Sequence, residues 1–403
     1  MNFITRQACM DSVTIAPSRQ FVRANTAATK LTVAAVPNFD FANAEYRALH
    51  ERSRATAFQN AGWLAALHQV VAPAVRAEPM TMAVRDASDG RLMLVLPFAR
   101  HRLHGLKFLR FADFGLCDYL GAIYDPADVP LLLADDSLPK RVADALPHHD
   151  VLQFTKLSGS DPLLEYVFPD MQRARMRVSA YPARLNGDWT AWRNTNIDQS
   201  FRRYLDMKRR RLKRTGTPHF RRLCDPDAIA CALEALRRYR SERFRALGVP
   251  DLLDSDAVFE FYKRMAIDGA RDGFARTHCL YLSGEPVAIT FGVVQRGVYA
   301  LLLVGLDVAR HSRLSPGLLA IEDTLRESLE AGDSTYDFTI GDHPYKLQFG
   351  GQPTSLYEWH QARTLRGHAA VLGITLVREV KRTLKPLMKR AKERLSKSAP
   401  AAG

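Results

Sequence analysis

The clearest pattern along the chain is a series of three apolar runs in its C-terminal half. They span Thr277–Leu282, Pro286–Val294 and Val298–Leu306, and each is long enough for one strand. The connections Ser283–Glu285 and Gln295–Gly297 are short and contain glycine, which is typical of β-hairpins. The pattern therefore predicts a three-stranded antiparallel meander.

Helical signals surround this meander. Asp225 followed by Pro226 is a favourable helix start, because Asp can cap the helix and Pro suits its first position. Ser255 and Ser315 stand at two further predicted helix starts, and we expect both to act as caps. The predicted elements are, in chain order, a helix at Asn196–Arg214, a strand at His219–Leu223, helices at Asp225–Leu247, Ser255–Gly273 and Pro316–Ala331, and a strand at Ser334–Ile340.

The N-terminal half carries a less regular pattern. It predicts strands at Leu31–Val36, Met80–Val84, Arg91–Ala99 and Val151–Leu157, and helices at Phe41–Ala72 and Asp136–Leu146. No internal repeat is visible in the sequence. A length of 403 residues favours two domains, which we divide at the Asn-Gly-Asp turn near Asn186 into 31–186 and 187–365. We expect a disordered tail at 1–30 and a separate basic segment at 366–403.

Composition narrows the class of protein. With 47% hydrophobic and 25% charged residues, the chain is typical of a folded globular protein. No apolar run approaches the roughly 20 residues that cross a bilayer, and the N-terminus has no apolar core of a secretory signal. The five cysteines form no C-x-x-C pair, so we expect free thiols in a reducing cytoplasm and neither a disulfide framework nor a metal site.

The net charge of +14 is concentrated in two segments. Residues 366–403 hold ten Lys and Arg against two Glu, a net +8, and 366–398 reads as a basic amphipathic helix. This helix either lies on an anionic membrane or packs with a solvated basic face. The second cluster, Arg202–Arg214, can bind phosphates, a polyanionic glycan or nucleic acid, or form a solvated helix face. Nucleic acid ranks last, because only Phe201 and Tyr204 are available there for base stacking.

The start of the Pro316 helix is the first candidate site. Exposed N–H groups at a helix start favour an anion such as a pyrophosphate, and Gly317 allows close approach of a ligand. Arg310, His311 and Arg313 add positive charge nearby. The alternative is an ordinary capped helix after a basic turn.

The second candidate site follows the Ser334–Ile340 strand. An aspartate inside so apolar a strand needs a partner or a chemical role, and Asp337 is such a residue. His343, Tyr345 and Lys346 follow within a short stretch. The alternatives are a structural hydrogen bond for Asp337 and an exposed turn position for His343.

Several segments of the chain, including the second candidate site, resemble a known protein family. The segments YLDMKRRRLKRTG, LSGEPVAITFGV and DFTIGDHPYKLQFG resemble the acetyltransferase domain (BioF2-like) of CelD-type cellulose-biosynthesis proteins, a GNAT branch related to the FemAB transferases. PFAR and FADFGLCDYLG resemble the companion domain of the same proteins. The pyrophosphate loop departs from many GNAT enzymes, with Ser-Pro-Gly in place of Gly-x-Gly, and His343 stands where an acidic residue is expected.

The resemblance implies a fold. It implies an α/β (α+β) protein with two GNAT-like domains in tandem, each a mixed, largely antiparallel sheet flanked by helices. It also implies acyl transfer from acyl-CoA, with acetyl-CoA as donor, to a small-molecule or glycan amine in exopolysaccharide or cell-envelope synthesis. A FemAB-like transferase that uses aminoacyl-tRNA is the enzyme alternative, and a nucleic-acid-binding protein is the non-enzyme alternative.

The resemblance also implies residue roles. Asp337 is the first candidate for general base and His343 the second, and Tyr345 can protonate the leaving thiolate. The expected donor-binding residues are Leu306, Arg310, Arg313, Ser315, Gly317 and Lys346, and the expected acceptor-binding residues are Asp118, Tyr119 and Arg243.

Overall fold

The computed structural model describes residues 31–373, and its strands form one large sheet. The strands are β1 (Leu31–Val36), β2 (Glu78–Asp86), β3 (Leu92–Leu103), β4 (Leu106–Phe111), β5 (Ile123–Tyr124), β6 (Val151–Leu157), β7 (Gln172–Arg184), β8 (Pro218–Leu223), β9 (Ala275–Leu282), β10 (Glu285–Gln295), β11 (Val298–Leu306), β12 (Thr335–Ile340) and β13 (Thr354–Ala362).

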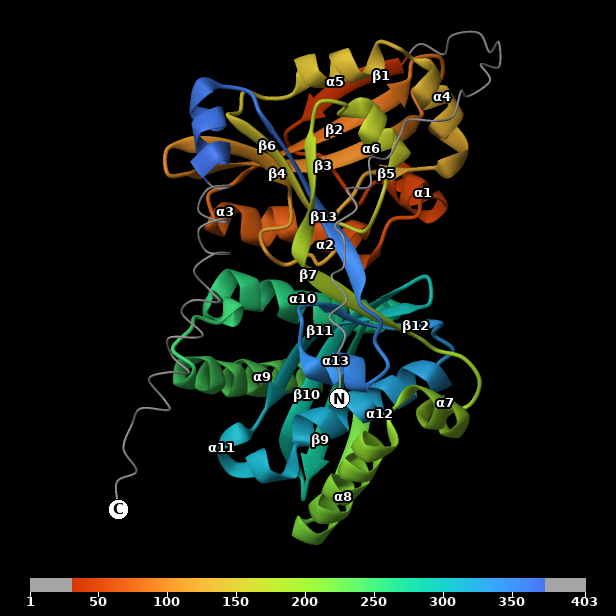
Figure 1. Ribbon diagram of the computed structural model, residues 1–403, viewed down its shortest axis with the longest axis vertical. Helices are drawn as coiled ribbons and strands as arrows, with labels where there is room; N and C mark the ends of the chain where they lie inside the picture. Colours follow the sequence, from red (N-terminus) through yellow and green to blue (C-terminus); the bar gives the residue numbers. More distant parts are fainter. Residues whose placement is uncertain (1–30, 374–403) are drawn as a thin grey trace, which may run out of the picture.

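Helices cover this sheet on both faces (Figure 1). The α-helices are α1 (Ala44–Arg52), α2 (Ala61–Ala66), α3 (Ala72–Ala74), α4 (Val129–Ala134), α5 (Leu138–Ala145), α6 (Pro162–Val167), α7 (Trp189–Asn196), α8 (Gln199–Thr215), α9 (Pro226–Ala246), α10 (Asp256–Asp272), α11 (Val308–His311), α12 (Pro316–Glu330) and α13 (Pro344–Gln348). Short turns of other helix types are η1 (Ala57–Gln59), η2 (Leu67–Val71), η3 (Pro126–Asp128), η4 (Leu252–Asp254) and η5 (Ser312–Leu314).

The sheet consists of two halves with the same strand pattern. In each half, four antiparallel strands (β1–β4 and β8–β11) are followed by a parallel neighbour (β6 and β12). The last strand of each half is exchanged: β7 follows β6 in the chain but pairs with β12, and β13 follows β12 but pairs with β6. β7 and β13 also pair with each other and join the halves, as Figure 1 shows. The two halves therefore repeat the same strand topology, although no repeat is visible in the sequence.

The expected fold class is confirmed: the sheet is mixed and mainly antiparallel, with helices on both faces. The bounds of Leu31–Val36 and Val151–Leu157 agree with the sequence prediction, and Asp225 caps α9 through the N–H of Ala228. The meander is also present, extended by β8 at one edge.

Several predicted elements were wrong in detail. The single helix expected at Phe41–Ala72 is broken, because Asn43 and Asn60 each cap a separate helix with a side-chain oxygen. The helix expected at Asn196–Arg214 is present but begins at Gln199, where Asp198 caps α8 by accepting the N–H of Ser200. The strands β7 and β13 were not predicted at all.

The two halves share a hydrophobic core. One continuous cluster includes Trp63 and Leu64 of α2 together with Phe261 and Tyr262 of α10. The rings of Trp63 and Phe261 are 4.8 Å apart and nearly perpendicular. Arg296, in the β10–β11 turn, donates to the carbonyl of Ala55 at 2.5 Å. The halves therefore pack as one folded unit.

The described residues contain no helix that is long and apolar enough to span a membrane, and no cluster of metal-ligating side chains. Four cysteines within 31–373 are free thiols. A helix that begins at residue 365 continues to 373. The rest of the predicted basic helix, 374–398, and the predicted tail 1–30 lie outside the described residues.

Candidate functional site

β11 and β12 begin as a parallel pair and then separate. Their register covers only Val298–Ala300 against Thr335–Asp337. β11 continues to Leu306 and β12 to Ile340 without further register pairing between them. The separation opens the sheet at the C-terminal ends of both strands, where the chain leaves β11 for the loop that leads to α12.

The start of α12 differs from the predicted cap. Ser315 has a left-handed backbone with φ of 53°, and its side chain makes no capping hydrogen bond, so the expected cap was wrong. A capping side chain reaches the helix N–H groups from an extended backbone, which Ser315 does not have. Its Oγ lies 2.9 Å from the hydroxyl of Tyr204 on α8 instead.

Only part of this helix start is open to an anion. Pro316 has no N–H, and the N–H groups of Leu318 and Leu319 both donate to the Ser315 carbonyl. Within the described chain, Gly317 has no backbone acceptor for its N–H. A side chain at Gly317 would place its Cβ 3.3 Å from Leu306, so the end of β11 and the start of α12 lie in direct contact.

The basic residues of the loop differ in availability. The Arg310 guanidinium donates to buried Asp307 at 2.6 Å, and this bond raises the pKa of Arg310. Arg313 is exposed, and its side chain has no ion pair among residues 31–373. Lys208 on α8 donates to the Arg313 carbonyl at 2.7 Å. Of the two predicted arginines, Arg313 is the one free to meet a phosphate.

β12 is kinked where it carries the candidate base. Thr339 has a left-handed φ of 59°, and the register against β7 shifts between Asp337 and Ile340. A left-handed β-branched residue is strained, and such strain is common at functional sites. The kink lets the Thr339 N–H donate to Asp337 Oδ1 at 2.7 Å, and the Thr339 hydroxyl donates across the opening to the Leu301 carbonyl at 3.1 Å.

Asp337 meets a residue from the other half of the protein. The Tyr119 hydroxyl donates to Asp337 Oδ2 at 2.5 Å. Asp337 is only 5% exposed, and this burial raises its pKa, which the hydrogen bond from Tyr119 opposes. Burial, together with the Asp337 charge, raises the pKa of Tyr119 as well. A carboxyl held in this way can take up a proton more readily than an exposed aspartate.

Two further ionisable groups surround this pair. Burial raises the pKa of Asp118, and Lys156 and Lys346 oppose the rise. Lys346 is 2% exposed and donates to the carbonyls of Thr339 and Ile340 at 3.0 and 2.9 Å. Burial lowers its pKa to about 8. Lys346 thus lies with the carboxylates rather than with the α12 loop where a phosphate role would place it.

Two further predicted residues, His343 and Tyr345, lie at the start of α13. We call this position the rim of the group that contains Asp337. His343 and Tyr345 stack with ring centroids 6.0 Å apart on and beside α13. Burial, helped by the charges of Lys346 and Arg243, lowers the pKa of His343. Burial raises the pKa of Tyr345 to about 12, and Arg243 opposes the rise. The charge of Arg243, an exposed residue on α9, thus acts on both side chains.

The equivalent opening in the N-terminal half is closed by the chain itself. Lys156, with φ of 57°, kinks β6 as Thr339 kinks β12. Its ammonium donates to Asp113 at 2.7 Å and to the Cys117 carbonyl at 2.6 Å, and Leu120 donates to the Lys156 carbonyl. The segment that carries Asp118 and Tyr119 therefore packs against the kink of β6.

The structure thus divides the predicted residues into groups. One group, between the halves, contains Asp118, Tyr119, Asp337 and Lys346; a second, on its rim, contains Arg243, His343 and Tyr345; a third, at the α12 start, contains Leu306, Arg310, Arg313, Ser315 and Gly317. Sequence reasoning missed Thr339, Lys156 and Tyr204. The two kinked residues leave no sequence signal, because nothing in Thr or Lys indicates a left-handed backbone. Tyr204 was noted only as an aromatic residue in a basic helix.

Comparison with known protein families finds a match in the C-terminal half. Residues 199–347 match the family described as acetyltransferase (GNAT) domain. This segment begins with α8 and ends within α13, so it contains the opening between β11 and β12, the α12 start and Asp337. A search of curated proteins finds no match.

Solved structures resemble the fold at low sequence identity. FemX is 12% identical with a TM-score of 0.51, covering 74% of this chain and 91% of FemX. The C-terminal domain of a putative lysylphosphatidylglycerol synthetase from Agrobacterium fabrum is 13% identical with a TM-score of 0.49, covering 84% and 96%. A tandem GNAT protein from the clavulanic acid pathway is 12% identical with a TM-score of 0.46, covering 83% and 98%. The likeness to FemX concerns the fold alone, and the family match shows that residues 199–347 form a GNAT-type acetyltransferase domain.

Proposed function

We propose that this protein is an N-acyltransferase that moves an acyl group, most simply acetyl, from CoA to an amine. The observation that carries the proposal is the buried contact between Asp337 and Tyr119 beside the opening of β11 and β12. It joins a proton acceptor from the GNAT domain to a side chain from the other half. An amine held there would meet both.

Fewer groups at the start of α12 are available to bind the donor than the sequence predicted. The N–H of Gly317 and the exposed guanidinium of Arg313 are free for phosphate oxygens, and the hydroxyls of Ser315 and Tyr204 lie beside them. Acyl-CoA supplies an activated thioester. We propose that backbone N–H groups near Leu306 orient its carbonyl. Arg310 stabilises the loop through Asp307 and does not need to touch the donor.

The residues between the halves handle protons. An amine must lose a proton to attack, and we assign its uptake to Asp337, directly or through the Tyr119 hydroxyl. The Asp118 charge raises the pKa of Asp337, and the Lys346 ammonium lowers it. Tyr345 stands at the rim as the proton donor for the leaving thiolate, and His343 is the alternative base. Arg243 faces the rim and is proposed to orient the acceptor.

Replacement of Asp337 tests this mechanism. Asp337→Asn keeps the shape but cannot accept a proton, so the acetylation rate with acetyl-CoA and an amine panel should fall by about 10²–10⁴-fold. The melting temperature should not fall, because a buried ionisable group is replaced by a neutral one. A wild-type rate in the Asp337→Asn variant would remove Asp337 from the mechanism.

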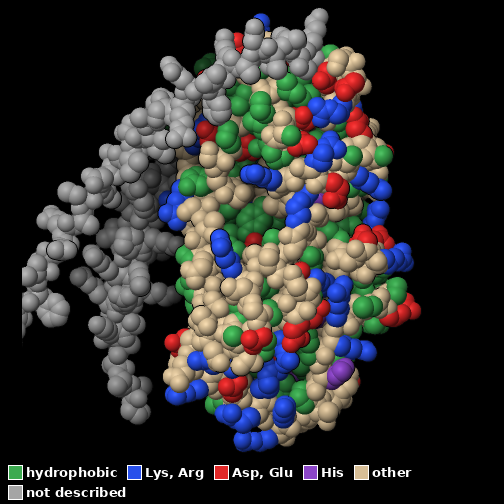
Figure 2. Space-filling view, turned by 90° about the vertical axis from the view of Figure 1, so that its right-hand side faces the viewer, with side chains coloured by type: hydrophobic (Ala, Val, Ile, Leu, Met, Phe, Trp, Pro, Cys, Tyr) green, Lys and Arg blue, Asp and Glu red, His purple; other side chains and the backbone are tan. Residues whose placement is uncertain are grey.

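A second candidate donor is aminoacyl-tRNA, and the surface of α8 favours it. Arg203, Arg210, Arg211, Lys213 and Arg214 are exposed and form no ion pair within 31–373. Figure 2 shows Lys and Arg side chains gathered at the lower end of the face it displays, the end where Figure 1 places α8 and α11. This surface adjoins the donor loop, because Lys208 reaches the Arg313 carbonyl.

Binding measurements separate the two donors. Acetyl-CoA at 100 times its dissociation constant should stabilise the protein by about 2.7 kcal/mol, which raises the melting temperature. Charged tRNA should instead bind with an affinity that falls steeply with salt. Stabilisation by tRNA without any effect of acetyl-CoA would replace the CoA proposal.

The cellular role is also a proposal. A CelD-type role in exopolysaccharide or envelope synthesis rests on the sequence resemblance. A cytoplasmic location rests on the cysteine pattern, and membrane contact rests on the basic amphipathic pattern of 366–398. The membrane contact has a direct test: a protein that ends at 363 should lose binding to anionic vesicles and keep its acetylation rate.

A further inference from the structure

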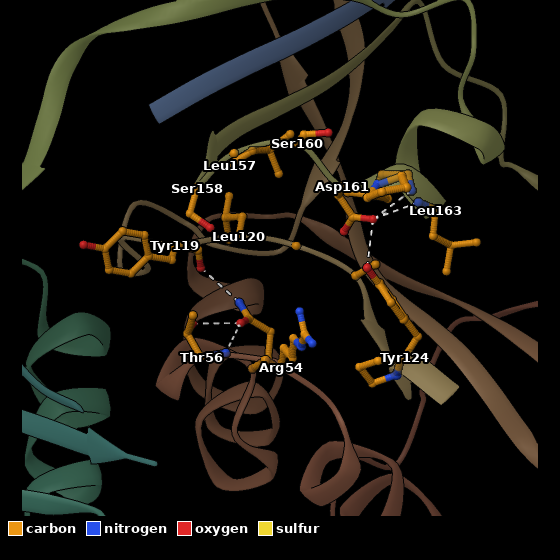
Figure 3. A pocket seen from close by; sticks show the side chains of 18 of the residues that line it. Arg54, Thr56, Tyr119, Leu120, Tyr124, Leu157, Ser158, Ser160, Asp161 and Leu163 are labelled. Atoms are coloured by element: carbon orange, nitrogen blue, oxygen red, sulfur yellow. Dashed lines mark hydrogen bonds between the residues drawn. The ribbon is translucent and has the colours of Figure 1, made fainter. Parts of the chain in front are cut away.

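A cavity lies in the N-terminal half, and of the residues grouped above only Tyr119 lines it. It has a volume of about 450 Å³, which is in the range of small-molecule sites. Its walls come from the chain after α1, the segment that leads from Tyr119 to Tyr124, and the chain between β6 and α6. Figure 3 shows Arg54, from the chain after α1, and Ser158 and Asp161, from the chain between β6 and α6, pointing toward it.

The charged groups of the cavity are placed to share one ligand. Asp161 Oδ1 accepts the Tyr124 hydroxyl and the N–H groups of Leu163 and Leu164. No hydrogen bond within the described chain uses its Oδ2. Arg54 is exposed and forms no ion pair among residues 31–373. One guanidinium and one carboxylate oxygen are therefore available, and their charges cancel.

This combination favours neighbouring hydroxyl groups. A hydroxyl can donate to a carboxylate and accept from a guanidinium, whereas a lone anion or cation would meet one attractive and one repulsive group. The hydroxyls of Ser158 and Thr56 add further polar partners, while Tyr124 and Leu164 supply apolar surface for C–H faces. Such mixed walls suit a sugar ring.

We propose that this cavity binds a neutral saccharide unit of the acceptor. Tyr119 connects it to the reacting group: its carbonyl accepts Gln59 Nε2 at 3.0 Å in the cavity wall, and its hydroxyl reaches Asp337. Figure 3 shows the Tyr119 ring directed away from the cavity, so the sugar unit and the reacting amine lie on opposite sides of this residue. The link to the acceptor rests on the proposed function, whereas saccharide binding does not.

Saturation-transfer NMR with the full chain tests the proposal. The probes are glucose, glucosamine and N-acetylglucosamine, compared with L-alanine and glycerol. The sugars should give transfer signals, and both Arg54→Gln and Asp161→Asn should weaken binding by at least about ten-fold. Asn keeps the helix cap of α6, so Asp161→Asn should fold normally. Arg52→Gln is the matched control, because Arg52 pairs with Asp125 outside the cavity lining and should leave binding unchanged.

Each result has a defined meaning. Absent sugar signals, unchanged binding in both cavity variants, or preference for L-alanine would overturn the saccharide proposal. Acetylation of a non-sugar amine without saccharide binding would do the same and leave the proposed function in place. Saccharide binding without acyl transfer from any donor would uphold the cavity and remove the proposed function.

Discussion

Asp337 gains its chemistry from residues that are distant in the chain. An exposed aspartate is fully ionised at neutral pH and a weak base, but burial raises the pKa of this one. Tyr119 comes from the other half of the protein and supplies the hydrogen bond that limits the rise. The balance between these two effects sets the pH at which Asp337 can accept a proton.

Removal of the Tyr119 hydroxyl should therefore shift the pH dependence. Tyr119→Phe removes a donor that favours the ionised carboxylate, so the pKa of Asp337 should rise further. Because the base acts only when ionised, the acidic limb of the kcat/KM profile should move to higher pH. Tyr345→Phe serves for comparison, since it should lower kcat without moving that limb. An unmoved limb in Tyr119→Phe would leave Tyr119 with a structural role only.

The sequence indicated Asp337, because a carboxyl among alternating apolar positions needs an explanation. It could not indicate Tyr119 as its partner, since that contact depends on how the two halves pack. The kinks at Thr339 and Lys156 were equally hidden. A left-handed backbone at such residues is imposed by tertiary contacts against their own preference.

At the scale of elements, α8 does more than present positive charge. Arg209 donates to both Glu322 and Asp323 of α12, and Arg193 of α7 donates to Glu322 at 2.8 Å. The Glu322 side chain is 3% exposed, so its charge depends on these partners. The basic helix thereby fixes α12, whose start forms the proposed donor site.

Loss of Arg209 should be costly for this reason. Arg209→Leu leaves a buried carboxylate with one partner fewer and should lower the free energy of unfolding by about 2–4 kcal/mol. Arg210 is an exposed neighbour that forms no ion pair in the described chain. Arg210→Leu should therefore change the free energy of unfolding by less than about 0.5 kcal/mol. Urea unfolding of both variants measures the difference. Equal stability of the two would show that the Glu322 contacts carry little energy.

Helices and strands with regularly spaced apolar residues were predictable from the sequence. Elements that are exposed along part of their length were not. β7 was missed because its first half carries exposed arginines, and only its second half, near Tyr181, is buried. The helix-cap prediction succeeded at Asp225 and was wrong at Ser255 and Ser315, whose side chains make no capping hydrogen bond. Ser255 has an extended backbone and Ser315 a left-handed one, so the backbone angle alone does not decide whether a serine caps a helix.

At the scale of the whole molecule, neither half is complete alone. Each half lacks its own last strand within a continuous stretch of chain, because β7 and β13 are exchanged. The core around Trp63 and Phe261 also belongs to both halves. The sequence predicted two domains from length alone and gave no sign of this exchange, because pairing partners depend on topology rather than on local pattern.

Unfolding should accordingly be a single event. Calorimetry of the full chain should show one transition, with the calorimetric and van't Hoff enthalpies equal. A large-to-small change at the shared core, Trp63→Ala, should lower that one melting temperature and not split it. Two separate transitions would show that the halves are independent units.

The exchange of β7 and β13 also limits how such a protein can be inherited and rearranged. A crossover between two related genes near residue 186 would deliver β7 from one parent and its partner β12 from the other. The boundary between the two parental sequences would lie beside Asp337, which pairs with Pro182 of β7, so a mismatch there would disturb the proposed catalytic groups. New acceptor preferences are therefore expected to arise by substitutions around existing cavities rather than by trading whole halves.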